Sequence, residues 1–163
     1  MTMQLAKKPC VCIFLLLVAT LIASHDASAS CNISSILNLP SMDLANYEKI
    51  QTNLLGYSAE GADVEYYYSF YILKAIKSTY YGETGKTELE YYFSSPITYA
   101  LKITENHYLA PIYLESSEII STNQVLLAVC KGELVRGIGD DMIYNYFRRL
   151  NSSLEDLLDN APK

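Results

Sequence analysis

The segment ITYALKIT, residues Ile97–Thr104, decides the fold class of this chain. Apolar and polar residues alternate along it with a period of two, which is typical of a β-strand with one buried face. The buried side of this strand would carry Ile97, Tyr99, Leu101 and Ile103. Similar alternation before and after the segment predicts an antiparallel sheet whose strands follow one another along the chain.

The neighbouring segments supply the rest of the predicted sheet. A turn is expected at Glu83–Lys86, where Gly85 can take a positive φ, and Ser94–Pro96 ends one strand. A bend is expected at Glu105–Asn106, and Ser116–Asn123 reads as a polar loop. The predicted strands are Val64–Leu73, a short strand at Tyr80–Tyr81, Thr87–Phe93, Ile97–Thr104, His107–Glu115 and Gln124–Cys130.

The segments that flank the sheet have other periods. Met42–Leu54 fits either a short helix capped by Asp43 or an irregular approach to a first strand. After Gly139 the period becomes that of a helix, which Asp140 or Asp141 can cap. Its apolar stripe is Ile143, Tyr146, Phe147 and Leu150.

Two further features belong to this C-terminal region. Arg148 and Arg149 would lie in the last turn of the helix, at the negative end of its dipole. Ser152–Glu155 has the pattern of a capping box and predicts a second short helix.

These elements together predict a mainly β protein. Gln124–Cys130 is apolar on both faces, so the helix at about residues 140–150 should cover the outer face, where Leu126 and Ala128 lie. The predicted fold is a small antiparallel up-and-down β-barrel with a C-terminal α-helix packed outside. It would form a single domain over residues 30–163.

Residues 1–29 have the features of a secretory signal peptide. Lys7 and Lys8 precede the apolar run Val11–Ala23, and the small residues Ala27–Ala29 suit a cleavage site. The apolar run is shorter than the ~20 residues that span a bilayer. A membrane anchor, or a bacterial lipoprotein modified at Cys31, is the alternative interpretation. The prediction is a protein secreted to the extracellular space.

Size and charge limit the function of the mature chain. Removal of 29 residues from 163 leaves 134, which suits one domain with one core. The leader carries a net charge of +1, from two lysines and Asp26, so the total of −6 becomes −7. A surface this acidic argues against a nucleic-acid partner and against anionic membranes. We expect no membrane insertion after cleavage.

The cysteines and sequons support secretion. Cys10 and Cys12 leave with the leader, and Cys31 and Cys130 should pair in an oxidising compartment. Such a disulfide closes a loop of about 100 residues and stabilises the fold by roughly 4–5 kcal/mol. Two free thiols are the alternative. The sequons at Asn32 and Asn151 predict N-glycosylation.

The order of elements resembles that of the lipocalins. The similar parts are Ile103–Leu114, Gln124–Val129, the helix after Gly139 and the approach Met42–Ile50, about half of the mature chain. The chain has no Trp and therefore lacks the family's Gly-x-Trp signature. The resemblance implies an eight-stranded barrel that binds a small apolar molecule in the extracellular fluid.

Fifteen tyrosines are the main candidate chemistry. A tyrosine combines an apolar ring with a hydroxyl that can orient a ligand, although aromatic rings also fill ordinary cores. We expect the inward-facing residues to line a cavity for a small hydrophobic or amphipathic ligand. The candidate ligand-binding residues are Tyr66, Tyr68, Tyr91, Phe93, Tyr99, Leu101, Tyr108 and Ile112.

The same sequence is compatible with a function other than ligand transport. A secreted protein-interaction module or inhibitor, cystatin-like and without a cavity, would need a long helix at Met42–Leu54. A protein receptor is compatible with either function. The mature chain has one histidine, His107, so we expect no catalytic residues, metal site or cofactor. Glu88 and Glu90 are expected on a solvated face.

Overall fold

The computed structural model describes residues 31–54, 61–114, 117–136 and 141–162, and residues from Asn32 onward form one compact unit. The predicted signal peptide therefore lies outside the described residues, as do Gly137–Asp140 and the side chains of Ile143, Tyr146 and Asn151. The elements are α2 (Ile33–Leu37), η1 (Leu39–Ser41), η2 (Leu44–Asn46), β1 (Glu48–Leu54), β2 (Ala62–Ser69), β3 (Ile72–Gly82), β4 (Gly85–Ser95), β5 (Thr98–Tyr108), β6 (Ile119–Cys130), β7 (Glu133–Arg136) and α3 (Asp141–Asp159).

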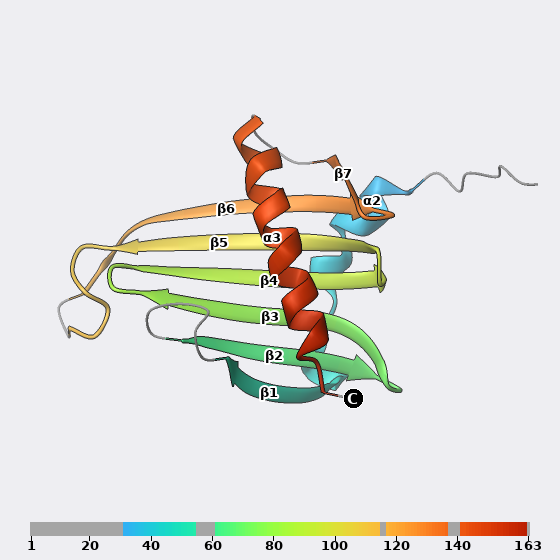
Figure 1. Ribbon diagram of the computed structural model, residues 1–163, viewed down its shortest axis with the longest axis horizontal. Helices are drawn as coiled ribbons and strands as arrows, with labels where there is room; N and C mark the ends of the chain where they lie inside the picture. The colour runs from blue at the N-terminus through green and yellow to red at the C-terminus, as the bar shows by residue number, and fades with distance from the viewer. Residues whose placement is uncertain (1–30, 55–60, 115–116, 137–140, 163) are drawn as a thin grey trace, which may run out of the picture. The chain divides into compact units, whose positions relative to one another are not determined.

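The prediction of a mainly β, antiparallel up-and-down sheet followed by a helix is confirmed (Figure 1). Seven strands pair in chain order from β1 to β7. Hydrogen bonds between described residues do not close this sheet into a barrel, because β1 and β7 pair with one neighbour each. The sheet therefore keeps two edges.

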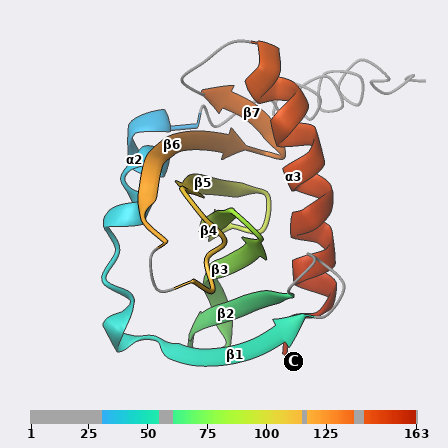
Figure 2. The same ribbon diagram turned by 90° about the vertical axis from the view of Figure 1, so that its left-hand side faces the viewer.

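The two faces of the sheet are covered by different segments (Figure 2). One face, here called the helix face, carries a row formed by Tyr66, Ile76, Tyr91, Leu101 and Leu127 in register. Helix α3 packs on this face. The opposite face carries the row Glu65, Lys77, Glu90, Lys102 and Leu126, and is called the polar face. Near β4–β6 it is covered by α2 and η1.

The position of α3 corrects the prediction that the helix lies outside, against Leu126 and Ala128. Phe147, Leu150, Leu154 and Leu157 are buried against the helix face. Both faces of β6 are apolar because α3 covers one face and α2 covers the other. The periodicity of the sequence alone does not indicate which helix covers which face. The predicted disulfide between Cys31 and Cys130 is present.

Helix α3 is also longer than predicted. It runs without interruption to Asp159, so Ser152–Glu155 does not begin a second helix. The buried spacing continues past Leu150 to Leu154 and Leu157, which keeps one face of a single helix on the sheet. Arg148 and Arg149 consequently lie in its middle, and its last turn has no basic residue.

Several predicted boundaries in the sheet were wrong. The segment Val64–Leu73 is two strands joined by a turn at Phe70–Tyr71, and Tyr80–Tyr81 belongs to the long strand β3. Gly85 pairs with Gly82 across the predicted turn but does not have a positive φ. Phe70–Tyr71 contains none of the usual turn residues, which is why the sequence did not reveal it.

Strand β5 runs through the predicted bend at Glu105–Asn106 and ends at Tyr108. The separate strand predicted at His107–Glu115 does not form: His107 and Tyr108 end β5, and Leu109–Leu114 are outside any strand. Strand β6 begins within the predicted loop Ser116–Asn123, at Ile119. These ends of β5 and β6 pair with each other while β6 stays exposed as far as Gln124. Because neither face of this two-stranded extension is buried, its sequence does not alternate between apolar and polar residues.

The ambiguous segment Met42–Leu54 forms the short helix η2 and then strand β1. The Asp43 carboxylate accepts a hydrogen bond from the Ala45 amide at 3.0 Å, which confirms the predicted cap. The long helix that a cystatin-like fold needs at this place does not form. The first strand of the sheet takes up these residues instead.

Candidate functional site

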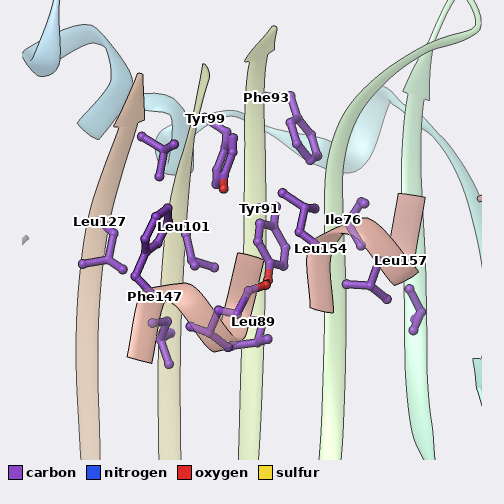
Figure 3. Packing of buried hydrophobic residues seen from close by; sticks show 14 of the residues in the cluster. Ile76, Leu89, Tyr91, Phe93, Tyr99, Leu101, Leu127, Phe147, Leu154 and Leu157 are labelled. Carbon is purple, nitrogen blue, oxygen red and sulfur yellow. The ribbon is translucent and has the colours of Figure 1, made fainter. Parts of the chain in front are cut away.

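The structure brings together six of the eight predicted ligand-binding residues, but beneath α3. Figure 3 shows Tyr91, Phe93, Tyr99 and Leu101 among them. Tyr66, Tyr91, Phe93, Tyr99 and Leu101 are buried in the core of the helix face, and Tyr68 packs at its margin. Tyr108 and Ile112 lie elsewhere: Tyr108 ends β5, and Ile112 follows it in the connection to β6. The Ile112 amide donates to the Glu83 carbonyl at 2.9 Å, in the turn after β3.

Three tyrosine hydroxyls on the helix face donate hydrogen bonds to backbone carbonyls of the C-terminal segment. Tyr66 donates to the Leu157 carbonyl at 2.9 Å, and Tyr91 donates to the Leu150 carbonyl at 3.3 Å. Tyr68 donates to the Pro162 carbonyl at 3.0 Å. The place expected for a small molecule in the middle of the sheet is therefore filled by α3.

Tyr99 illustrates how tightly this core is packed. Its ring centroid lies 5.9 Å from that of Tyr91 and 5.7 Å from that of Phe93, with tilted planes. Such tilted contacts add to the apolar burial of the rings. Burial raises the pKa of Tyr99 to about 12, so the hydroxyl stays protonated at physiological pH.

An open cleft of about 300 Å³ remains at one end of the sheet. Strands β3 and β4 pair from Gly82–Gly85 to Ala75–Tyr92, and beyond that pair they separate. Irregularities in register lie at the same level, because Lys74 has no partner on β2 and Ser94 has none on β5. The cleft lies where the strands part. It is lined by Ile72, Leu73, Lys74, Phe93, Ser94, Ser95, Pro96 and Leu158.

The lining of this cleft is amphipathic. Ile72, Leu73, Phe93 and Leu158 supply apolar walls, and Lys74 is the charged residue among those that line it. Lys74 makes no ion pair with another residue in the described ranges. An apolar cleft whose lysine has no ion pair among the described residues suits a ligand with an apolar body and an anionic end.

The polar face contains a second arrangement that the sequence did not reveal. Glu90 is 9% exposed and forms ion pairs with Lys77 at 3.0 Å and Lys102 at 2.7 Å. It also accepts a hydrogen bond from the Tyr92 hydroxyl at 2.6 Å. Burial raises the pKa of Glu90, but the hydrogen bonds from Lys102, Tyr92 and Lys77 outweigh it and lower the pKa to about 2. The prediction that Glu90 lies on a solvated face is therefore wrong, because its side chain is buried.

This network is part of a cross-strand row in which the charge alternates. Glu65, Lys77, Glu90 and Lys102 occupy neighbouring strands in direct register. Lys49 pairs with Glu65 from β1 at 3.0 Å. A polar hollow of about 300 Å³ lies beside the row and includes Asp63, which accepts from the Tyr81 hydroxyl at 3.1 Å. The hydrogen bonds among these groups are internal, so we interpret the row as structural.

The other site predictions can be placed in the fold. His107 is exposed near the end of β5, and the described residues contain no group of three His, Cys, Asp or Glu side chains that could hold a metal ion. Asn32 is exposed, and its side-chain oxygen caps α2 by accepting from the Ser35 amide at 3.1 Å. Within the described ranges, no helix is long and apolar enough to span a membrane.

Comparison with known proteins gives no relative for this chain. No family description matches the sequence, and neither the curated proteins nor the solved structures contain a match.

Proposed function

We propose that this protein is secreted and binds a small amphipathic molecule in the cleft between β3, β4 and α3. The apolar body of the ligand would lie against Phe93 and Leu158, and its anionic end would reach Lys74. The carrier function implied by the lipocalin resemblance motivates this proposal. The site differs from the expected one, because it lies at the end of the sheet and not at its centre.

The observation that carries the proposal is the combination of volume, lining and charge in the cleft. Its volume of about 300 Å³ is at the lower end of the range for small-molecule pockets, about 300–1,000 Å³. A short hydrocarbon chain matches this volume better than a sterol or a long lipid. The signal-peptide pattern and the Cys31–Cys130 disulfide support secretion.

Titration with straight-chain carboxylates of increasing length, followed by calorimetry, tests this function. We expect medium-chain carboxylates to bind and the matched alkylammonium ions to bind about tenfold more weakly, because the ammonium end meets Lys74. Lys74→Met should weaken carboxylate binding by a similar factor, since it removes the charge but keeps the apolar stem. Leu158→Glu should abolish binding by placing a carboxylate in the apolar wall.

Lys131→Met is the matched control for Lys74→Met. Lys131 is an exposed lysine in the β6–β7 turn and does not line the cleft, so its loss should leave carboxylate binding unchanged. Equal affinity for carboxylates and ammonium ions, or unchanged affinity in the Lys74→Met variant, would contradict the proposed site.

A further inference from the structure

The tip of the β2–β3 hairpin holds two aromatic side chains in solvent. Phe70 and Tyr71 are 93% and 96% exposed. Because Ser69 pairs with Ile72, these two residues form the whole connection between the strands. Both have a positive φ, of 48° and 65°, as a type I′ turn requires.

This choice of residues is unfavourable for the turn itself. Type I′ turns favour Asn and Gly, because a bulky side chain with a positive φ is strained. The β6–β7 hairpin of the same sheet has a glycine, Gly132, at the second position of its two-residue turn. Neither ring at the β2–β3 tip is buried in compensation. The stability of the fold therefore does not explain the two aromatic residues.

The aromatic pair continues into an apolar surface. Ile72 is 59% exposed beside it, and both Ile72 and Leu158 line the rim of the cleft. We call Phe70, Tyr71 and Ile72 the knob. Rigid aromatic side chains that protrude from a short hairpin are typical anchors of protein–protein interfaces.

Carboxylates outnumber cations around the knob, where Lys74 is the charged residue that lines the cleft with Ile72. Glu48 lies opposite Tyr68 on β1, and Glu155, Asp156 and Asp159 lie on the C-terminal part of α3, which also carries Leu158. All four carboxylates are exposed, and none forms an ion pair with another described residue. The last turn of α3 contains no basic residue, so the helix dipole adds to this negative potential.

We propose that the knob docks on a basic amphipathic segment of a partner protein. The apolar stripe of that segment would cover Phe70 and Tyr71, while its lysines or arginines would pair with Glu48 and the acidic end of α3. Charge complementarity favours this partner over a second copy of the chain and over an anionic lipid surface, because both would bring negative charge to the acidic rim. The proposal does not depend on the proposed ligand of the cleft.

The test uses a variant that keeps the turn and removes the rings, the double substitution Phe70→Asn and Tyr71→Gly. The probes are two synthetic amphipathic helices, one of leucine and lysine and one of leucine and glutamate. We expect the leucine–lysine helix to bind the full chain and to lose affinity about tenfold or more with the double variant. The variant should melt a few degrees higher than the native protein, because Asn-Gly suits the turn.

The control is Leu109→Ser with Tyr113→Ser, which removes two exposed apolar side chains at the opposite end of the sheet. This control should bind the leucine–lysine helix like the native protein. Binding of medium-chain carboxylates to the knob variant, measured in parallel, should be unchanged, which separates this inference from the function of the cleft.

Three results would overturn the proposal. The first is equal binding of the leucine–lysine helix to the native chain and the knob variant. The second is binding of the leucine–glutamate helix as tight as that of its basic counterpart. The third is knob-dependent binding to neutral phosphatidylcholine vesicles without binding of either peptide, which would assign the knob to a membrane surface.

Discussion

At the scale of single residues, Glu90 shows how a strand can bury a charge near the surface. Its carboxylate lies between Lys77 and Lys102 on neighbouring strands, and Tyr92 donates a hydrogen bond to it from the same strand. A carboxylate in this position must stay ionised, because a neutral acid would leave two partly buried lysines without a counterion. The alternating row therefore fixes the register of β3, β4 and β5.

Glu90→Gln should destabilise the protein by about 2 kcal/mol at neutral pH, through the loss of charge-assisted hydrogen bonds. The pKa of Glu90 is lowered from 4.5 to about 2 in the folded protein. Its contribution is therefore complete above about pH 5 and is lost as the pH falls toward 2. Urea unfolding at a series of pH values should show the difference between native protein and variant shrinking over this window.

Glu88→Gln is the matched control for that measurement. Glu88 lies on the same strand and face, and its one ion pair among the described residues is with Lys86, where both side chains are partly exposed. Its replacement should change the free energy of unfolding by less than about 0.5 kcal/mol. A difference between native protein and Glu90→Gln that stays constant from neutral pH to pH 3 would contradict the assigned role of Glu90.

At the scale of elements, the fit between α3 and the sheet depends on tyrosines. Tyr66 and Tyr91 each place a ring in the core and a hydroxyl on a backbone carbonyl of the C-terminal helix. Carbonyls in the last turn of a helix have no partner within the helix, so the Leu157 carbonyl gains one from Tyr66. The sheet thus caps the helix that covers it.

Tyr66→Phe should destabilise the protein by about 1 kcal/mol, because the Leu157 carbonyl would lose its buried donor. Tyr68→Phe is the comparison: its hydroxyl binds the Pro162 carbonyl in a partly buried place, where water can replace it, so the loss should be smaller. Denaturant midpoints of both variants measure this order. A Tyr66→Phe variant as stable as native protein would show that the bond to α3 contributes nothing.

The sequence predicted the faces of the strands better than the elements that cover them. Alternation placed Leu89, Tyr91 and Phe93 on one face with Tyr99 and Leu101, as the structure has them, because successive side chains of a strand point to opposite faces of the sheet. It did not reveal which face receives α3, since β6 is apolar on both sides. A strand that is apolar on both faces can pack against α2 or α3 on either face.

The periodicity of the sequence did not predict the cleft or the knob, for different reasons. The cleft follows from irregular pairing at Lys74 and Ser94, which depends on how strands meet and not on their composition. The turn of the knob, Phe70–Tyr71, interrupts Val64–Leu73 with two residues that are more typical of strands than of turns. Of the predicted ligand-binding residues, Phe93 alone lines the cleft.

At the scale of the whole molecule, the disulfide joins the segment before the sheet to its sixth strand. Cys31 precedes α2, and Cys130 ends β6 on the face that α2 covers. The disulfide closes a loop of about 100 residues that contains strands β1 to β6. In the chain-entropy account, such a loop restricts the unfolded chain more than the folded one.

Replacement of both cysteines by serine should lower the free energy of unfolding by roughly 4–5 kcal/mol. Denaturant unfolding of the native protein with and without a reductant should give the same difference. The single Cys31→Ser variant, measured as a monomer, is the internal comparison, because loss of either partner opens the loop. Unchanged midpoints under reductant would contradict a stabilising bond.

The order of the chain has a consequence for biosynthesis. Helix α3 follows the strands it covers, and its bonds to Tyr91 and Tyr66 join residues 59 and 91 positions apart. The strands and both cysteines of a nascent chain are therefore synthesised before α3. Until α3 is translated, the aromatic residues of the helix face stay uncovered. For the secreted protein that we propose, a chaperone of the secretory pathway would recognise the growing chain during that interval.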